Sequence, residues 1–133
     1  MAVLNADKDF LLLSKAKTLV KHTLTMTDNT KRYPKKYRFS IVNRMQELSI
    51  DIYELINTAN ELNVTRKDEL QERLRLQNLA ITKCKTLIFF ITISLENDNI
   101  ALNDSQAENW AKKCLDVKNM AVRWHAKDRE KLY

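Results

Sequence analysis

The stretch that decides the fold covers residues 41–62 and reads IVNRMQELSIDIYELINTANEL. Its apolar residues alternate at spacings of four and three without a miss: Ile41, Met45, Leu48, Ile52, Leu55, Ala59 and Leu62. This spacing places an apolar stripe along one face of an α-helix. The stretch is therefore predicted to be an amphipathic helix that packs against other helices.

The same spacing recurs in three further segments, so we expect helices near residues 7–28, 35–62, 66–97 and 104–130. The stripe of the third helix contains one polar residue, Gln77, and the stripe of the fourth ends at Trp124. The connections are short, as in an up-down-up-down bundle. The sequence predicts an all-α four-helix bundle in which residues 1–133 form a single domain.

Local signals set the expected helix starts. Pro34 suits the first turn of the second helix, because its missing N–H would have no partner there. The segment 105–108, Ser-Gln-Ala-Glu, fits a capping box at the start of the fourth helix. The segment 65–68, Thr-Arg-Lys-Asp, is a variant of the same pattern at the start of the third.

The chain contains no glycine and one proline. Tight turns and phosphate-binding loops use glycine for its access to positive φ, whereas glycine weakens helices. The absence of glycine thus supports the all-α fold. It also excludes Walker-type and dinucleotide-binding loops, which need several glycines.

Residues suited to catalysis or metal binding are few. His22, His125, Cys84 and Cys114 share no local ligand spacing, and both cysteines lie on the predicted core stripes. Buried, unreactive thiols are the simpler interpretation. We expect no catalytic residue, no metal site and no cofactor, and so a protein that is not an enzyme.

The connection before the second helix carries the sharpest charge signal, within a chain of net charge +6. It contains five cations, no acid and three aromatic residues, namely Lys31, Arg32, Lys35, Lys36 and Arg38 with Tyr33, Tyr37 and Phe39. Cations neutralise phosphates and aromatic rings stack on unpaired bases, which favours RNA or DNA as partner. The alternative is that Tyr37 or Phe39 is buried and the cations are simply solvated.

A second basic region lies near the C-terminus, where Arg123, Lys127 and Lys131 share one helix face. Stabilisation of the helix dipole is the alternative explanation. In an up-down bundle the 31–38 connection lies at the same end as the 97–103 connection. Acidic residues around 97–103 are therefore expected to neutralise part of its charge.

From residue 87 to residue 95 the third helix is apolar nearly all round. Either neighbouring helices cover both sides, or the extra face contacts another subunit. We favour a subunit interface made by Leu87, Phe89, Phe90 and Ile93. This run is far shorter than a membrane span, and residues 1–10 do not resemble a signal peptide, so we expect a cytoplasmic protein without membrane contact.

The sequence resembles a known family along most of its length. The segment 33–39, YPKKYRF, is followed by Asn43-Arg44, by a Leu/Arg-rich stretch at 73–76 and by Trp124. These features resemble the four-helix-bundle family that includes the accessory variability determinant of diversity-generating retroelements. Relatives are encoded in intervening sequences of bacterial 23S ribosomal RNA genes.

The resemblance implies a homopentameric barrel that binds a reverse transcriptase and its template RNA. It also implies nucleic-acid contacts by Lys35, Lys36 and Arg38, to which we add six cations: Lys31, Arg32, Arg73, Arg75, Arg123 and Lys127. Arg38 could instead form a structural ion pair. The alternative function is a homo-oligomeric scaffold for protein interactions whose basic charge is incidental.

Overall fold

The computed structural model describes residues 10–132, which form four long helices and three short helical segments. The long helices are α2 (Leu11–Asp28), α3 (Asn43–Glu61), α4 (Lys67–Glu96) and α5 (Asp104–Arg129). The short segments are η2 (Lys35–Tyr37), η3 (Arg38–Val42) and η4 (Glu130–Leu132). No strand occurs among the described residues, and the predicted all-α four-helix bundle is confirmed.

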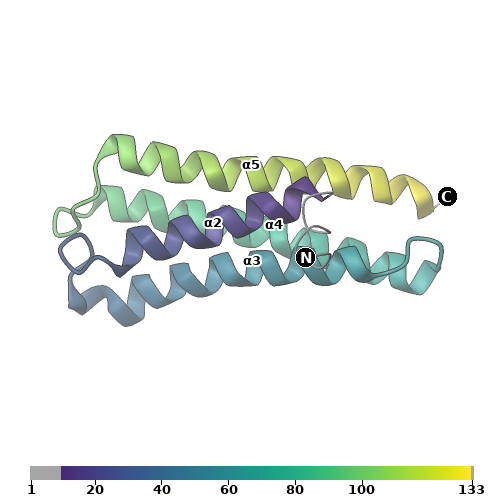
Figure 1. The fold of residues 1–133 in the computed structure, drawn as a ribbon, viewed down its shortest axis with the longest axis horizontal. Coiled ribbons are helices and arrows are strands. Elements are labelled where there is room, and N and C mark those ends of the chain that lie inside the picture. The colour runs from purple at the N-terminus through teal and green to yellow at the C-terminus, as the bar shows by residue number, and fades with distance from the viewer. Residues whose placement is uncertain (1–9, 133) are drawn as a thin grey trace, which may run out of the picture.

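The four helices lie side by side, and each packs against two principal neighbours: α2 and α4 each contact both α3 and α5 (Figure 1). The α2–α3 and α4–α5 connections lie together at one end of the bundle (Figure 1). The α3–α4 connection lies at the opposite end, where the chain also terminates (Figure 1). The predicted proximity of the 31–38 and 97–103 connections is therefore observed.

The predicted helix boundaries hold to within a few residues, with one exception at the start of the second helix. The expected start of the first helix at residue 7 lies outside the described residues. Between residues 35 and 42 the chain forms a 3₁₀ turn and a π turn rather than α-helix, and Pro34 directly precedes this segment instead of lying in its first turn. The π turn is wider than an α turn, and both Ile41 and Val42 are buried at its end.

Both predicted capping boxes were wrong. At the start of α5 the cap is Asn103, whose side chain accepts a hydrogen bond from the backbone N–H of Gln106 while the Gln106 side chain accepts one from the Asn103 N–H. Asparagine caps as well as serine does, so the box begins two residues before Ser105. Arg66, not Thr65, directly precedes α4 and makes no side-chain cap, and the Thr65 hydroxyl donates to Asn63.

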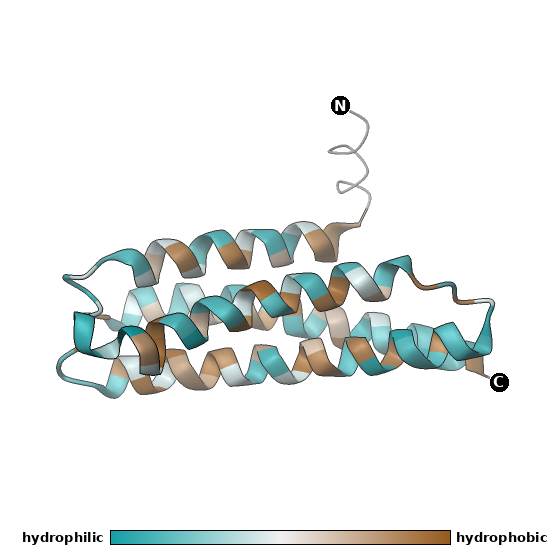
Figure 2. Ribbon diagram, turned by 90° about the horizontal axis from the view of Figure 1, so that it is seen from below, coloured by the Kyte–Doolittle hydropathy of each residue, from teal (hydrophilic) through white to brown (hydrophobic). Residues whose placement is uncertain are grey.

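Most residues of the predicted stripes are buried in the core, which also contains residues outside them such as Tyr33, Ile100 and Leu102. Hydrophobic and hydrophilic residues alternate along each helix (Figure 2). Two of the residues expected at a subunit interface also belong to this core. Leu87 is fully buried and Phe90 is 9% exposed within the single chain. Helix α4 packs against both α3 and α5, so it buries a wider arc than a helix with one neighbour. The interface prediction was therefore wrong for Leu87 and Phe90.

Helix α4 is also long and apolar enough to cross a membrane when judged by length and composition alone. The central helix of a helical bundle meets the same criterion. Throughout its length α4 contributes buried residues to the core, from Leu70 to Ile91 and Ser94.

Candidate nucleic-acid interface

The connection between α2 and α3 presents a cluster of cations, and we call residues 31–39 the basic tip. Four of its cations are exposed to solvent: Lys31, Lys35, Lys36 and Arg38. Among the described residues, no carboxylate forms an ion pair with any of the four. The structural ion pair considered for Arg38 is therefore not seen there, although the Asp28 carboxylate lines the same pocket as Lys35 and Arg38.

The fifth cation of the tip, Arg32, is not exposed like the other four. It is half-buried, and its Nη1 donates to the backbone carbonyl of Met26 at 3.1 Å. Its own carbonyl accepts a hydrogen bond from the N–H of Ala101 at 2.9 Å. Arg32 thus ties the basic tip to the end of α2 and to the α4–α5 connection.

The three aromatic residues of the basic tip differ in burial. Tyr33 is only 2% exposed, and burial raises the pKa of its hydroxyl to about 12. Tyr37 is half-buried against the core, and its hydroxyl donates to Asn97 Oδ1 at 3.4 Å and accepts from Asn99 Nδ2 at 3.3 Å. Phe39 is 81% exposed. Two aromatics therefore hold the tip in place, and the third is free at the surface.

The α4–α5 connection positions the basic tip without neutralising it. Its acidic neighbours Glu96, Asp98 and Asp104 were expected to offset part of the charge. None of them forms an ion pair with a cation of the tip in the described part of the chain. The two connections are joined by neutral hydrogen bonds instead, so the positive charge of the tip is retained.

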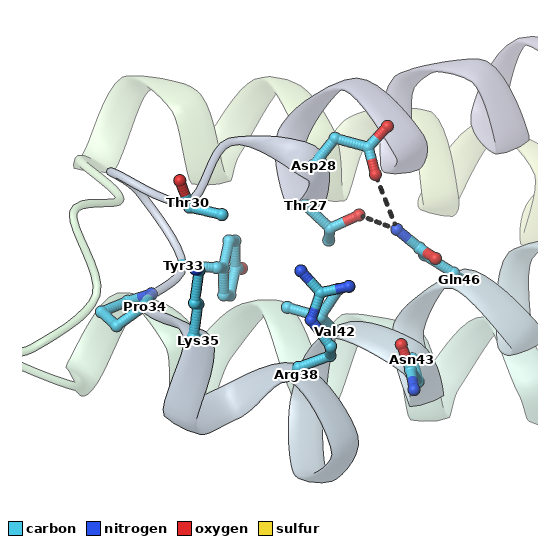
Figure 3. A pocket seen from close by; sticks show the side chains of 10 residues that line it. All are labelled: Thr27, Asp28, Thr30, Tyr33, Pro34, Lys35, Arg38, Val42, Asn43 and Gln46. Atoms are coloured by element: carbon cyan, nitrogen blue, oxygen red, sulfur yellow. Dashed lines mark hydrogen bonds between the residues drawn. The ribbon is translucent and has the colours of Figure 1, made fainter.

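A small pocket of about 90 Å³ lies beside the basic tip (Figure 3). Its lining residues come from the end of α2, the tip and the start of α3, and they are Thr27, Asp28, Thr30, Tyr33, Pro34, Lys35, Arg38, Val42, Asn43 and Gln46. The Gln46 amide donates to Thr27 Oγ1 at 2.9 Å and to Asp28 Oδ1 at 3.1 Å (Figure 3). Sites for small molecules usually measure about 300–1,000 Å³. The pocket beside the tip is therefore smaller than a usual small-molecule site.

Arg73, predicted to contact nucleic acid, is instead buried at the other end of the bundle. Its side chain is 10% exposed, and its Nε donates to Asp128 Oδ2 at 2.7 Å. Nη1 donates to the carbonyls of Ala59 and Leu62 at the end of α3, at 3.3 and 3.1 Å. A guanidinium buried and held in this way is not presented to a phosphate at the surface, so the prediction for Arg73 was wrong.

Further contacts make Arg73 the centre of a buried polar network. Its guanidinium lies 4.8 Å from the centre of the Trp124 ring, and Gln77 Nε2 donates to the same Asp128 oxygen at 2.7 Å. Lys131 pairs with the other oxygen of Asp128. Burial by itself would raise the pKa of Asp128, but hydrogen bonds from Arg73, Lys131 and Gln77 outweigh it and lower the pKa. The carboxylate is therefore ionised and structural.

Three other predicted binding residues are exposed but lie away from the basic tip. Arg75 pairs with Glu72 through two hydrogen bonds of 2.9 and 2.6 Å. Arg123 and Lys127 are on the C-terminal part of α5, at the end of the bundle opposite the tip (Figure 1). The structure thus divides the predicted binding residues between two ends that the length of α4, about 45 Å, separates.

The histidines and cysteines form no reactive site in the described residues. Burial lowers the pKa of both His22 and His125, with a further contribution from nearby cations. Cys84 and Cys114 are buried free thiols, and burial raises the pKa of Cys84 to about 12. No three His, Cys, Asp or Glu side chains within residues 10–132 gather as metal ligands would.

Two of the residues expected at a subunit interface remain available. Phe89 is 55% exposed and Ile93 is half-buried on α4. Two shallow hollows of about 540 Å³ each lie on α5 and between α4 and α5, the second lined from α4 by Ile91, Thr92 and Leu95. They share Glu108 and Ala111 among their lining residues, so they adjoin each other.

Sequence reasoning missed Arg44, which is exposed one turn after the basic tip and lies 5.6 Å above the ring of Phe90. The sequence did indicate its position, because Arg44 directly precedes Met45 of the core stripe and therefore lies at the edge of the buried helix face. Asp128 was also missed, although it lies four residues after Trp124 and thus continues the stripe of α5.

The chain matches no protein-family model, no curated protein and no solved structure.

Proposed function

We propose that this protein is a non-enzymatic, nucleic-acid-binding accessory subunit that acts as a homo-oligomer beside a reverse transcriptase. One observation carries the proposal. The four exposed cations of the basic tip, Lys31, Lys35, Lys36 and Arg38, have no ion-pair partner among the described residues. A polyanion is the partner that such a surface favours.

The expected binding energy comes from release of counterions from the nucleic acid. Each phosphate neutralised on a single strand contributes a slope of about −0.7 to the dependence of log K on log salt. Four contacts therefore predict that affinity falls about 50-fold between 50 and 200 mM salt. Burial of an apolar face would show almost no such dependence over this range.

Two features support an accessory role rather than a catalytic one. The pocket beside the basic tip is too small for a nucleotide, at about 90 Å³. The tip is also fixed to the α4–α5 connection by Arg32 and Tyr37, so it presents a stable surface. The reverse transcriptase as protein partner, and RNA as template, rest on the resemblance of segment 33–39 and Trp124 to the retroelement family. A reverse transcriptase gene beside the gene of this protein would support that assignment.

Fluorescence anisotropy with a labelled structured RNA tests the proposal. The variant K35E/K36E/R38E should lose binding at 50 mM salt and keep its helical circular dichroism. The matched control K15E/K17E/K21E carries the same change in net charge on three exposed lysines of α2 and should stay within about fivefold of the wild type. Equal affinities of the two variants would overturn the proposal for the basic tip.

A homo-oligomeric scaffold for protein interactions is the second candidate function. The exposed ring of Phe89, three residues before Thr92 in the lining of the hollow between α4 and α5, favours it. Multi-angle light scattering at 150 mM salt distinguishes the two functions. A mass near five times 15.7 kDa that rises with RNA supports the accessory subunit. An oligomer that is indifferent to RNA supports the scaffold, and loss of the oligomer in F89E would locate its interface.

A further inference from the structure

Phe39 is the most exposed large hydrophobic side chain among the described residues, at 81%. It lies in the π turn η3 (Arg38–Val42), two residues before the buried Ile41 and Val42. The turn therefore fixes the backbone on both sides of the residue while its ring remains in solvent. Single π turns are frequent at functional sites.

The surroundings of Phe39 are cationic and free of ion pairs. Arg38 precedes it, and Lys35 and Lys36 lie one turn earlier, all three exposed. Arg44 is exposed on the following turn. An apolar partner surface would gain nothing from these four charges, whereas a partner that offers phosphates beside a flat ring would use both features.

We propose that Phe39 is a stacking platform for an unpaired base, so that the basic tip binds single-stranded nucleic acid in preference to a duplex. The inference rests on the proposed function and specifies its ligand. In a duplex the faces of internal bases are covered by their neighbours, and only phosphates and groove edges are available. An exposed phenyl ring can reach the face of a base in a loop, a bulge or a free strand.

The other aromatic residues of the tip cannot take this role. Tyr33 is buried beside Met45, and Tyr37 is held by Asn97 and Asn99 of the α4–α5 connection. Phe39 makes no aromatic contact with another ring within residues 10–132. One base per tip is therefore the expected stoichiometry of stacking.

The test measures anisotropy with three labelled probes of equal length at 50 mM salt. The probes are an unstructured 12-nucleotide RNA, the same RNA annealed to its complement, and a 12-unit abasic strand that keeps the phosphates. F39A should weaken binding of the unstructured RNA by about 5- to 150-fold, the range of a lost base stack. F39W and F39Y should stay close to the wild type. F39A should bind the duplex and the abasic strand as the wild type does.

Two further measurements test whether F39A acts on base stacking or only disturbs the structure. The variant L79A truncates an exposed hydrophobic side chain on α4 and should not change binding of the unstructured RNA. The emission of the new indole in F39W should be quenched by the unstructured RNA and not by the abasic strand. Circular dichroism should show the same helicity for all variants.

Each contrary outcome is distinct. If F39A binds the unstructured RNA as the wild type does while K35E/K36E/R38E loses it, the stacking role is overturned and the proposed function stands. An equal loss by F39A on all three probes also overturns it, because the abasic strand offers no base. If the wild type binds none of the probes, the proposed function fails and the inference with it. If F39A instead weakens binding only to vesicles containing phosphatidylserine, the platform contacts a membrane surface and not a base.

Discussion

Nε of Arg73 in α4 lies 2.7 Å from Oδ2 of Asp128 in α5, and both side chains are almost completely buried. This ion pair joins two helices at the end of the bundle where α3 terminates. The same guanidinium reaches the carbonyls of α3, so three helices meet at one side chain. Removal of either charge would leave the other buried without a partner.

We expect Asp128→Asn to lower the free energy of unfolding by about 3–5 kcal/mol, because the Arg73 guanidinium would remain buried and unneutralised. Urea denaturation followed by circular dichroism measures this change. Glu108→Gln is a suitable control on the same helix, since Glu108 is exposed and should change stability by less than about 0.5 kcal/mol. Similar midpoints for both variants would contradict the structural role of the pair.

The stability of the protein should depend on Asp128 at acidic pH. The hydrogen bonds it accepts lower its pKa in the folded state below the ordinary value of 3.8. A lowered pKa means that the stabilisation is present above pH 3.8 and is lost as the pH falls through the folded-state pKa. The difference in unfolding free energy between the wild type and Asp128→Asn should therefore shrink below about pH 4. A difference that stays constant down to pH 2.5 would show that the carboxylate is not stabilised in this way.

The buried hydrogen bond between Trp110 and Thr23 gives a third prediction. The indole N–H of Trp110 donates to Thr23 Oγ1 at 3.1 Å, and both residues are fully buried. Thr23→Val keeps the shape of the side chain but leaves the N–H unsatisfied, which should cost about 1–3 kcal/mol in thermal or urea unfolding. Thr25→Val, on the exposed side of the same helix, is the matched control and should be nearly neutral.

The two thiols should be unreactive in the folded protein. Burial raises the pKa of Cys84 from 9.0 to about 12, so at pH 8 its thiolate fraction is about 1,000-fold smaller than that of an exposed thiol. The pKa of Cys114 is raised in the same direction by burial. Ellman's reagent should therefore label neither thiol at pH 8 until guanidinium is added, and should then label both. Rapid labelling of the native protein would show that α4 and α5 separate readily.

The exposed cations at the other end of the bundle should matter only for long ligands. Arg123 and Lys127 lie far along α5, which starts at the same end of the bundle as the basic tip, so they are roughly 30–35 Å from that end. R123E/K127E should bind a six-nucleotide RNA as the wild type does and should bind a long structured RNA more weakly. Anisotropy with the two probes measures both effects, and weaker binding of the short probe would move the main contact surface to the C-terminal end.

The helices could be predicted from the sequence because apolar spacing is a local property. The stripe from Ile41 to Leu62 needs no knowledge of what it packs against. The spacing does not distinguish Tyr37 from Phe39, because the alternation leads from Ile41 back to Arg38 and the chain from 35 to 42 is not α-helical. The π turn could not be predicted, since no composition signal marks it.

The burial of Arg73 could not be predicted in the same way. Charged residues are assigned to the surface unless a partner is known, and the partner here is 55 residues away in sequence. Polar residues at stripe positions, Gln77 and Asp128, were the available signal that two helices shared a buried network. The many apolar residues near Leu87 and Phe90 led to the wrong interface prediction for a related reason. The width of the helix face that α4 buries depends on how many helices pack against it, and the local sequence does not show that number.

The way α3 ends has a consequence for the cooperativity of folding. Many helices terminate with a glycine in a left-handed conformation, which satisfies the last carbonyls within the local chain. This sequence contains no glycine, and no residue from 10 to 132 has a positive φ. The Ala59 carbonyl accepts a hydrogen bond from the N–H of Leu62 as well as one from Arg73, and the Leu62 carbonyl accepts one from Arg73. The orientation of Arg73 in turn depends on Asp128 of α5. The α2–α3 hairpin by itself therefore lacks the partner of its last carbonyl, and the end of α3 is completed only when α4 and α5 dock.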